Sequence, residues 1–120
     1  MRYLSTLVSG RSDTPPPPEL FEAIMTLGQE AGAAGVLLDQ GGVMPQTRTR
    51  ITAGSGDLTV LDGPFTETKE LLSYAIYEVR SAAEAVEWTR RFMELHQRLW
   101  PGWSGESEVV QIMGGGDVPS

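Results

Sequence analysis

One decapeptide, residues 61–70, concentrates side chains whose types could do chemistry: Leu-Asp-Gly-Pro-Phe-Thr-Glu-Thr-Lys-Glu. Asp62 or Glu67 can serve as a general base, since a carboxylate placed within reach of a substrate proton can accept it. Asp62 also has a structural alternative, because an Asp side chain at a turn commonly accepts hydrogen bonds from the backbone that follows it. Gly63 and Pro64 predict a stiff turn at this point, and both roles of Asp62 stay open.

Three cations near this turn form a candidate anion site. Arg48 and Arg50 are two residues apart in a segment that alternates like a strand, so their side chains share one face. A guanidinium fork suits a carboxylate, and Lys69 can converge on the same small anion. Solvated surface charge on an exposed hairpin, or an ion pair with Asp57, explains the same residues equally well. The candidate ligand-binding residues are therefore Arg48, Arg50, Asp62 and Lys69.

The single histidine, His96, falls late in an expected helix. We expect it at the surface near the helix end, where positive charge is favoured. A metal site would need further ligands, and the chain has neither a second histidine nor a cysteine. Coordination by carboxylates alone has no motif behind it. The sequence predicts neither a metal site nor a cofactor.

Aromatic residues flank both candidate regions. Phe65 is interpreted as a core plug that anchors the turn, with stacking on a ligand as the alternative. Trp100 and Trp103, on either side of a Pro-Gly pair, predict a packed corner that ends the second helix, and lining of a pocket mouth is the other option.

Composition limits the classes of function. The chain has 120 residues, of which 40% are hydrophobic and 21% charged, and this suits one globular domain. Its net charge of −7 argues against a broad basic surface for nucleic acid. No apolar run approaches the roughly 20 residues that cross a bilayer. Without cysteine no disulfide can form. The default expectation is a cytoplasmic protein with no direct nucleic-acid or membrane partner.

The periodicity of apolar residues predicts the order strand, helix, strand, hairpin, long strand, helix, strand. The expected strands are 3–9, 36–38, 47–52, 58–61, 71–79 and 108–113, and the expected helices run from about 18 to 32 and from 81 to about 99. A glycine turn is expected at Gly41-Gly42. This order indicates an α+β, ferredoxin-like antiparallel sheet with two helices on one face. We expect one domain over residues 1–113 and a flexible tail over 114–120.

Both faces of the expected sheet are apolar. Tyr3 and Leu7 point to one side of the first strand, whereas Leu4 and Val8 point to the other. The helices can cover only one face, and an open apolar face several strands wide exceeds what a monomer usually exposes. The sequence therefore predicts a homodimer in which two sheets face each other.

Residues 61–70 resemble the signature of the YCII-related domain family, in the branch often called DGPF after Asp62 and the three residues that follow it. The aromatic strand Tyr74–Val79 and the corner Trp100–Trp103 extend the resemblance. It implies a dimeric ferredoxin-like α/β barrel. One branch of the family carries a His–Asp pair and is associated with dehydrochlorinase-like elimination. Other members are linked to extracytoplasmic-function sigma factors. The first helix, where the family's histidine is expected, contains none.

Three hypotheses about function follow. The preferred one is a small homodimeric protein that binds a small ligand or regulates a partner, without catalysis, because the expected histidine is missing. The alternative is a lyase acting on a small aromatic or carboxylated substrate, with Asp62 or Glu67 as the base. A third is an accessory protein that contacts a transcription component through protein rather than DNA.

Overall fold

The computed structural model describes residues 1–63, 65 and 71–114 of the chain. Within them the structure contains the following elements, in chain order: β1 (Arg2–Arg11), α1 (Pro18–Ala33), β2 (Leu37–Gly42), the 3-10 turn η1 (Pro45–Thr47), β3 (Thr49–Ala53), β4 (Leu58–Asp62), β5 (Ser73–Glu78), α2 (Ala82–Leu99) and β6 (Ser104–Ile112).

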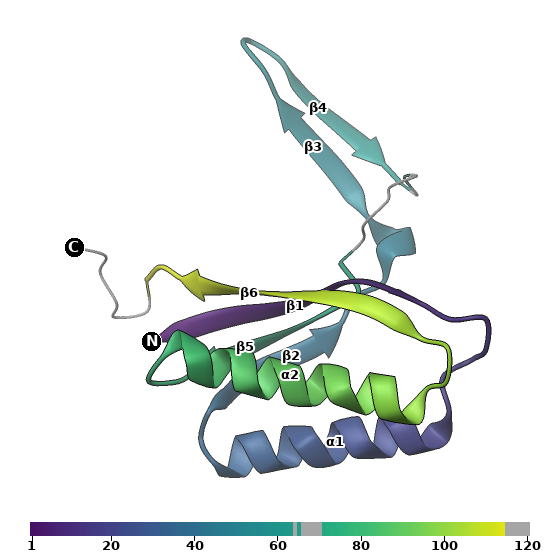
Figure 1. The fold of residues 1–120 in the computed structure, drawn as a ribbon. Coiled ribbons are helices and arrows are strands. Elements are labelled where there is room, and N and C mark those ends of the chain that lie inside the picture. Colours follow the sequence, from purple (N-terminus) through teal and green to yellow (C-terminus); the bar gives the residue numbers. More distant parts are fainter. Residues whose placement is uncertain (64, 66–70, 115–120) are drawn as a thin grey trace.

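Four of the strands form one antiparallel sheet in the order β2-β5-β1-β6. Both helices cover the same face of this sheet, and β3 and β4 form a separate hairpin that projects away from it (Figure 1). The predicted α+β, ferredoxin-like arrangement is therefore confirmed. No helix in the described part of the chain is both long enough and apolar enough to span a membrane.

The helix boundaries follow from local sequence. Pro18 opens α1 at a position where its missing N–H costs nothing, and Gly35 follows the helix with a φ of +75°. The expected stop at Gly32 is therefore a few residues early. Ser81 caps α2 as predicted, by accepting a hydrogen bond from the backbone N–H of Glu84 over 3.2 Å.

One local prediction about strand β2 differs from the structure. Gly41 and Gly42 do not form a turn but continue β2, where they pair with Tyr74 and Ser73 of β5. A Cβ at Gly41 would lie 3.1 Å from the ring of Tyr74, so this glycine makes room for its cross-strand neighbour. Glycine served here as a small residue inside a strand rather than as a turn former.

One cluster of buried residues lies at one end of the space between helices and sheet, and Leu7, Leu20 and Leu27 are buried outside it. The cluster is formed by Tyr3, Ala31, Tyr77, Val79 and Ala85, with Val109 and Trp88 packed against it. Ala31 lies in the last turns of α1 and Ala85 in the first turn of α2, so the core gathers where these two ends meet the sheet.

The other sheet face is bare of helices. Leu4 of β1 stands between Ile76 of β5 and Val110 of β6 in the strand register. The side chain of Val110 is 56% exposed. The predicted apolar residues on the second face are therefore present, and no described helix or strand covers them (Figure 1).

Candidate functional site

A pocket of about 490 Å³ lies between the helices and the sheet, next to the core cluster, and Tyr77 belongs to both. Much of its sheet lining is small, with Ser5, Gly41, Gly42, Ser73 and Ala75 beside the larger Leu7, Tyr74 and Tyr77. The lining comes from five elements and includes Ser5 and Leu7 of β1, Gly41 of β2, Ser73 and Ala75 of β5, Phe21 and Ile24 of α1, and Phe92 and His96 of α2.

His96 is the titratable group placed deepest in this pocket, with 5% of its surface exposed. Its Nδ1 lies 2.9 Å from the carbonyl oxygen of Phe92. A carbonyl only accepts, so Nδ1 carries the proton and Nε2 of the neutral ring is an acceptor. The rings of Phe92 and Trp103 each lie 4.6 Å from the His96 ring, centroid to centroid. The imidazole is therefore fixed in position and in tautomer.

Burial lowers the pKa of His96, because desolvation penalises the charged ring, and the hydrogen bond to Phe92 offsets this only in part. The ring is therefore neutral at pH 7. Nε2 makes no hydrogen bond to a described residue, yet no fully buried side-chain nitrogen or oxygen in the described chain lacks a partner. It follows that Nε2 is not fully buried, and His96 is one of the residues that line the pocket.

Two buried hydroxyl groups, those of Ser5 and Thr89, form a hydrogen bond beside the pocket. Thr89 of α2 donates to the carbonyl oxygen of Ala85 over 2.9 Å, and its hydroxyl lies 2.8 Å from that of Ser5. Each hydroxyl has one proton, so Ser5 is the donor between the two. This bond ties α2 to β1 beside the pocket.

Gln40 and Tyr74 line the pocket where strand β2 forms the edge of the sheet. A Cβ on Gly28 of α1 would lie only 2.7 Å from Nε2 of Gln40, so this glycine admits the amide against the helix. The hydroxyl of Tyr74 donates to Asp39 over 2.9 Å. That hydrogen bond raises the pKa of Tyr74, with smaller contributions from burial and from the Asp39 charge.

Among the described residues, the pocket lining includes no aspartate, glutamate, lysine or arginine. Burial raises the pKa of Tyr77, another lining residue, so its hydroxyl stays protonated at neutral pH. Neutral His96 offers an acceptor and Tyr77 a donor among apolar walls. This arrangement can hold a neutral molecule with an apolar body and one or two polar groups.

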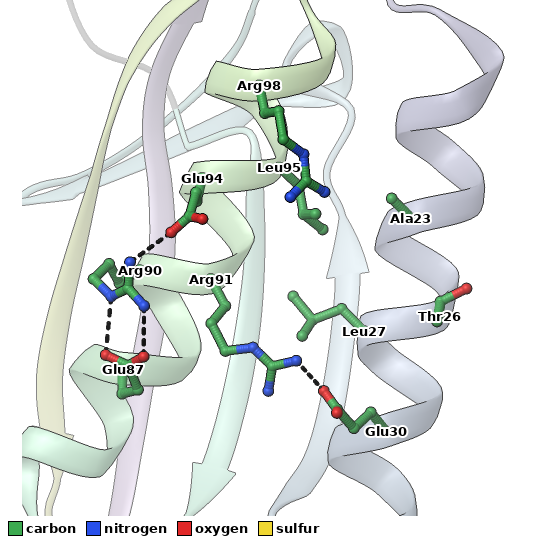
Figure 2. Close-up of a pocket in the computed structure, with 10 residues that line it drawn as sticks. All are labelled: Ala23, Thr26, Leu27, Glu30, Glu87, Arg90, Arg91, Glu94, Leu95 and Arg98. Carbon is green, nitrogen blue, oxygen red and sulfur yellow. Dashed lines mark hydrogen bonds and ion pairs between the residues drawn. The ribbon is translucent and has the colours of Figure 1, made fainter.

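A second hollow, on the outer surface of the helices, has a different character. It measures about 570 Å³ and is lined by α1 and α2. Figure 2 shows Arg90 held between Glu87 and Glu94 on α2, and Arg91 reaching across to Glu30 on α1. The hydrogen bond to Arg90 lowers the pKa of Glu87. Of these ion pairs, Arg91–Glu30 joins the two helices, and Ala23, Leu27 and Leu95 add apolar side chains to the charged lining.

The residues predicted for an anion site lie elsewhere, at the base of the projecting hairpin. Asp62 ends β4 and accepts a hydrogen bond from the Thr49 hydroxyl over 2.9 Å. The guanidinium of Arg50 lies 4.1 Å from the ring centroid of Phe65. Arg48 precedes β3, and its carbonyl oxygen accepts from the N–H of Gly63 over 2.7 Å. None of these residues lines the pocket, and Glu67 and Lys69 fall outside the described residues, as do residues 115–120 of the expected tail.

Two interpretations of single residues are wrong. Phe65 is half-buried beside Arg50 and does not belong to the core, because the hairpin base stands away from the helices. His96 is buried rather than superficial. It follows Ala85, Thr89 and Phe92 at helical spacing, so it shares their sheet-facing side. This helical spacing could have indicated from the sequence that His96 is buried. The polar residues Thr89 and His96 made that face of the helix look less apolar.

The aromatic corner forms as predicted. The indole N–H of Trp100 donates to the carbonyl oxygen of Thr14 over 3.0 Å, and Gly102 turns the chain with a φ of +80°. The indole of Trp103 covers Gly10 and Gly105, which are paired across β1 and β6. Trp103 thus packs against both the His96 ring and the β1–β6 strand pair.

The family model described as YCII-related domain matches residues 1–96. The chain belongs to the YCII-related domain family. A search of curated proteins finds no match to it. In this YCII-related protein, the matched region extends through α2 as far as His96, so it includes every residue of the pocket lining.

Proposed function

We propose that this YCII-related protein binds a small neutral molecule in the pocket between helices and sheet. The observation that supports the proposal is His96, which lines the pocket with a neutral ring fixed by Phe92 and with Nε2 not fully buried. A buried polar atom that is accessible but unpaired is the kind of group that fixes the orientation of a ligand.

The chemistry of the lining defines the ligand class. Nε2 of His96 selects a hydrogen-bond donor, such as a phenolic hydroxyl or an amide N–H. Phe21, Ile24 and Phe92 suit an apolar or aromatic body. A carboxylate is disfavoured, because burying an ion without a cation beside it is costly. This proposal replaces the arginine-rimmed site that the sequence suggested.

Matched probes test the ligand class. We expect 4-methylphenol to bind more tightly than toluene, which lacks the donor, and 4-methylbenzoate to bind weakest, as measured by ligand-observed NMR. His96→Leu should weaken 4-methylphenol at least tenfold and leave toluene within twofold. Gln97→Ala, one residue away and exposed, is the matched control. Equal binding of 4-methylphenol and toluene, or preference for the benzoate, would contradict the proposal.

We also propose that the protein is a homodimer joined through the bare sheet face. The row Ile76, Leu4 and Val110 supports this, since it presents apolar side chains on the side away from the helices. Sedimentation equilibrium at micromolar concentration should give twice the 13.0 kDa of one chain. A mass of one chain under those conditions would exclude the homodimer.

The lyase and transcription hypotheses remain predictions. If the protein has a lyase activity, His96 is better placed to act as base than Asp62, because Asp62 lies at the hairpin base and not in the pocket lining. Purification from native extract tests the transcription hypothesis, which requires a sigma factor to remain associated with the protein.

A further inference from the structure

The hairpin β3–β4, residues 49–62, forms a projecting arm. Its two strands pair with each other from Thr49 and Asp62 to Ala53 and Leu58. All ten strand residues are exposed, and among the described elements the arm's extensive contacts are internal. A two-stranded hairpin without a packing partner is marginally stable in water.

One face of this arm is apolar. Residues directly opposite in an antiparallel pair share a face, so the pair Ile51 and Val60 and the pair Ala53 and Leu58 lie together. The exposed fractions of Ile51, Leu58 and Val60 are 65%, 71% and 61%. The other face carries Thr52 and Thr59, together with Arg50 and Leu61 at the base of the arm.

The arm has few of the features that keep exposed strands apart. Edge strands in monomers are commonly protected by charges, by lysine above all, or by proline. Residues 49–62 contain no lysine or proline, and their charged side chains, Arg50, Asp57 and Asp62, lie at the base and at the tip of the hairpin. An exposed apolar hairpin of this composition is suited to packing against another protein surface.

The direction of the arm indicates which surface that is. Figure 1 shows the arm rising from the sheet on the side away from α1 and α2. The arm and the bare sheet face with Leu4 and Val110 thus form the two sides of one open angle (Figure 1), and each side carries exposed apolar side chains. A second copy of the chain has a sheet face to set against this sheet face and an arm of its own to return the contact, as two-fold symmetry requires.

We propose that in the homodimer the arm of each protomer packs across a second copy of this chain, through the face that carries Ile51, Leu58 and Val60. The proposal rests on the homodimer proposed above and adds a distinct interface to it. The two subunits then exchange their arms. The second copy supplies packing for a hairpin that has little packing within its own subunit.

Thiol reactivity on the two faces of the arm tests this proposal. The protein contains no cysteine, so a single introduced thiol reports on its own position. Val60→Cys places the thiol on the apolar face, and Thr59→Cys, the adjacent residue of β4, places it on the other face as the matched control. In the dimer we expect Val60→Cys to react with a thiol-specific reagent at least tenfold more slowly than Thr59→Cys. Dilution to monomer should bring the two rates within twofold.

The outcomes separate the two proposals. If sedimentation shows a wild-type dimer but both thiols react equally fast in it, the arm proposal is overturned and the dimer stands. If the wild-type chain sediments as a monomer, the dimer fails and the arm proposal fails with it. Far-UV circular dichroism of each variant establishes that it is folded. A second measurement uses the dimer dissociation constant, which Val60→Glu should raise at least tenfold and Thr59→Glu should leave unchanged.

Discussion

The imidazole of His96 and the carbonyl of Phe92 stand one helical turn apart and are joined by a hydrogen bond of 2.9 Å. This contact uses the proton on Nδ1, so Nε2 is the acceptor nitrogen of the neutral ring. A buried histidine of this kind links the candidate site to the stability of the fold.

We expect the free energy of unfolding to fall as the pH drops below the unfolded histidine pKa of about 6.5. Burial lowers the pKa of His96 in the folded protein, so the unfolded chain binds the proton first and gains from acid. The contribution is complete above pH 6.5 and is lost at up to about 1.4 kcal/mol per pH unit. Urea unfolding followed by tryptophan fluorescence between pH 5 and 8 measures this. His96→Gln should remove the slope in this window, and an unchanged slope would contradict the assignment.

The hydroxyl pair Ser5 and Thr89 should show coupling. Thr89→Val keeps the side-chain shape but leaves the buried Ser5 hydroxyl without its acceptor, at a cost of about 1–3 kcal/mol. The double variant Ser5→Ala/Thr89→Val should recover part of this loss, because no polar group is then left unpaired. Denaturant titration of the four proteins gives the coupling. Thr26→Val on the exposed side of α1 serves as control, and additive losses would contradict the pair.

Two glycines should respond to alanine in opposite directions. A Cβ on Gly105 would collide with the indole of Trp103 and lie 2.6 Å from the carbonyl oxygen of Ser9. Gly105→Ala is therefore expected to cost about 1–3 kcal/mol of unfolding free energy. Gly32→Ala meets no atom within 4 Å and should gain up to about 1 kcal/mol from helix propensity. Thermal unfolding measures both, and a stable Gly105→Ala would mean that Trp103 does not cover β6 as described.

Asp62→Asn tests whether the turn predicted at Asp62 and Gly63 is a binding site. Asp62 accepts a hydrogen bond from Thr49 at an exposed position, so its loss should cost less than about 1 kcal/mol. We expect 4-methylphenol to bind Asp62→Asn as it binds the wild-type protein, whereas His96→Leu loses the probe. Loss of binding in Asp62→Asn with unchanged stability would move the site to the arm base.

Much of the fold could be predicted from the chemistry of residues that are adjacent in the sequence. Pro18 and Ser81 mark helix starts that the structure reproduces, because capping depends on a few adjacent residues. The alternation of Tyr3 and Leu4 placed apolar groups on both sheet faces, since successive strand residues must point to opposite sides. The resemblance carried by residues 61–70 led to a family that the match over residues 1–96 confirms.

The candidate site could not be predicted from the sequence in this way. The sequence grouped Arg48, Arg50 and Asp62 by nearness along the chain, and the hairpin keeps them at its base, outside the pocket lining. The pocket instead joins Ser5 of β1 to His96 of α2, 91 positions later in the chain. Sequence alone determined the elements and their apolar faces, because those depend on periodicity and caps. Only the tertiary structure decided where the core ends and a cavity begins, because that depends on which small and large side chains meet across layers distant in sequence.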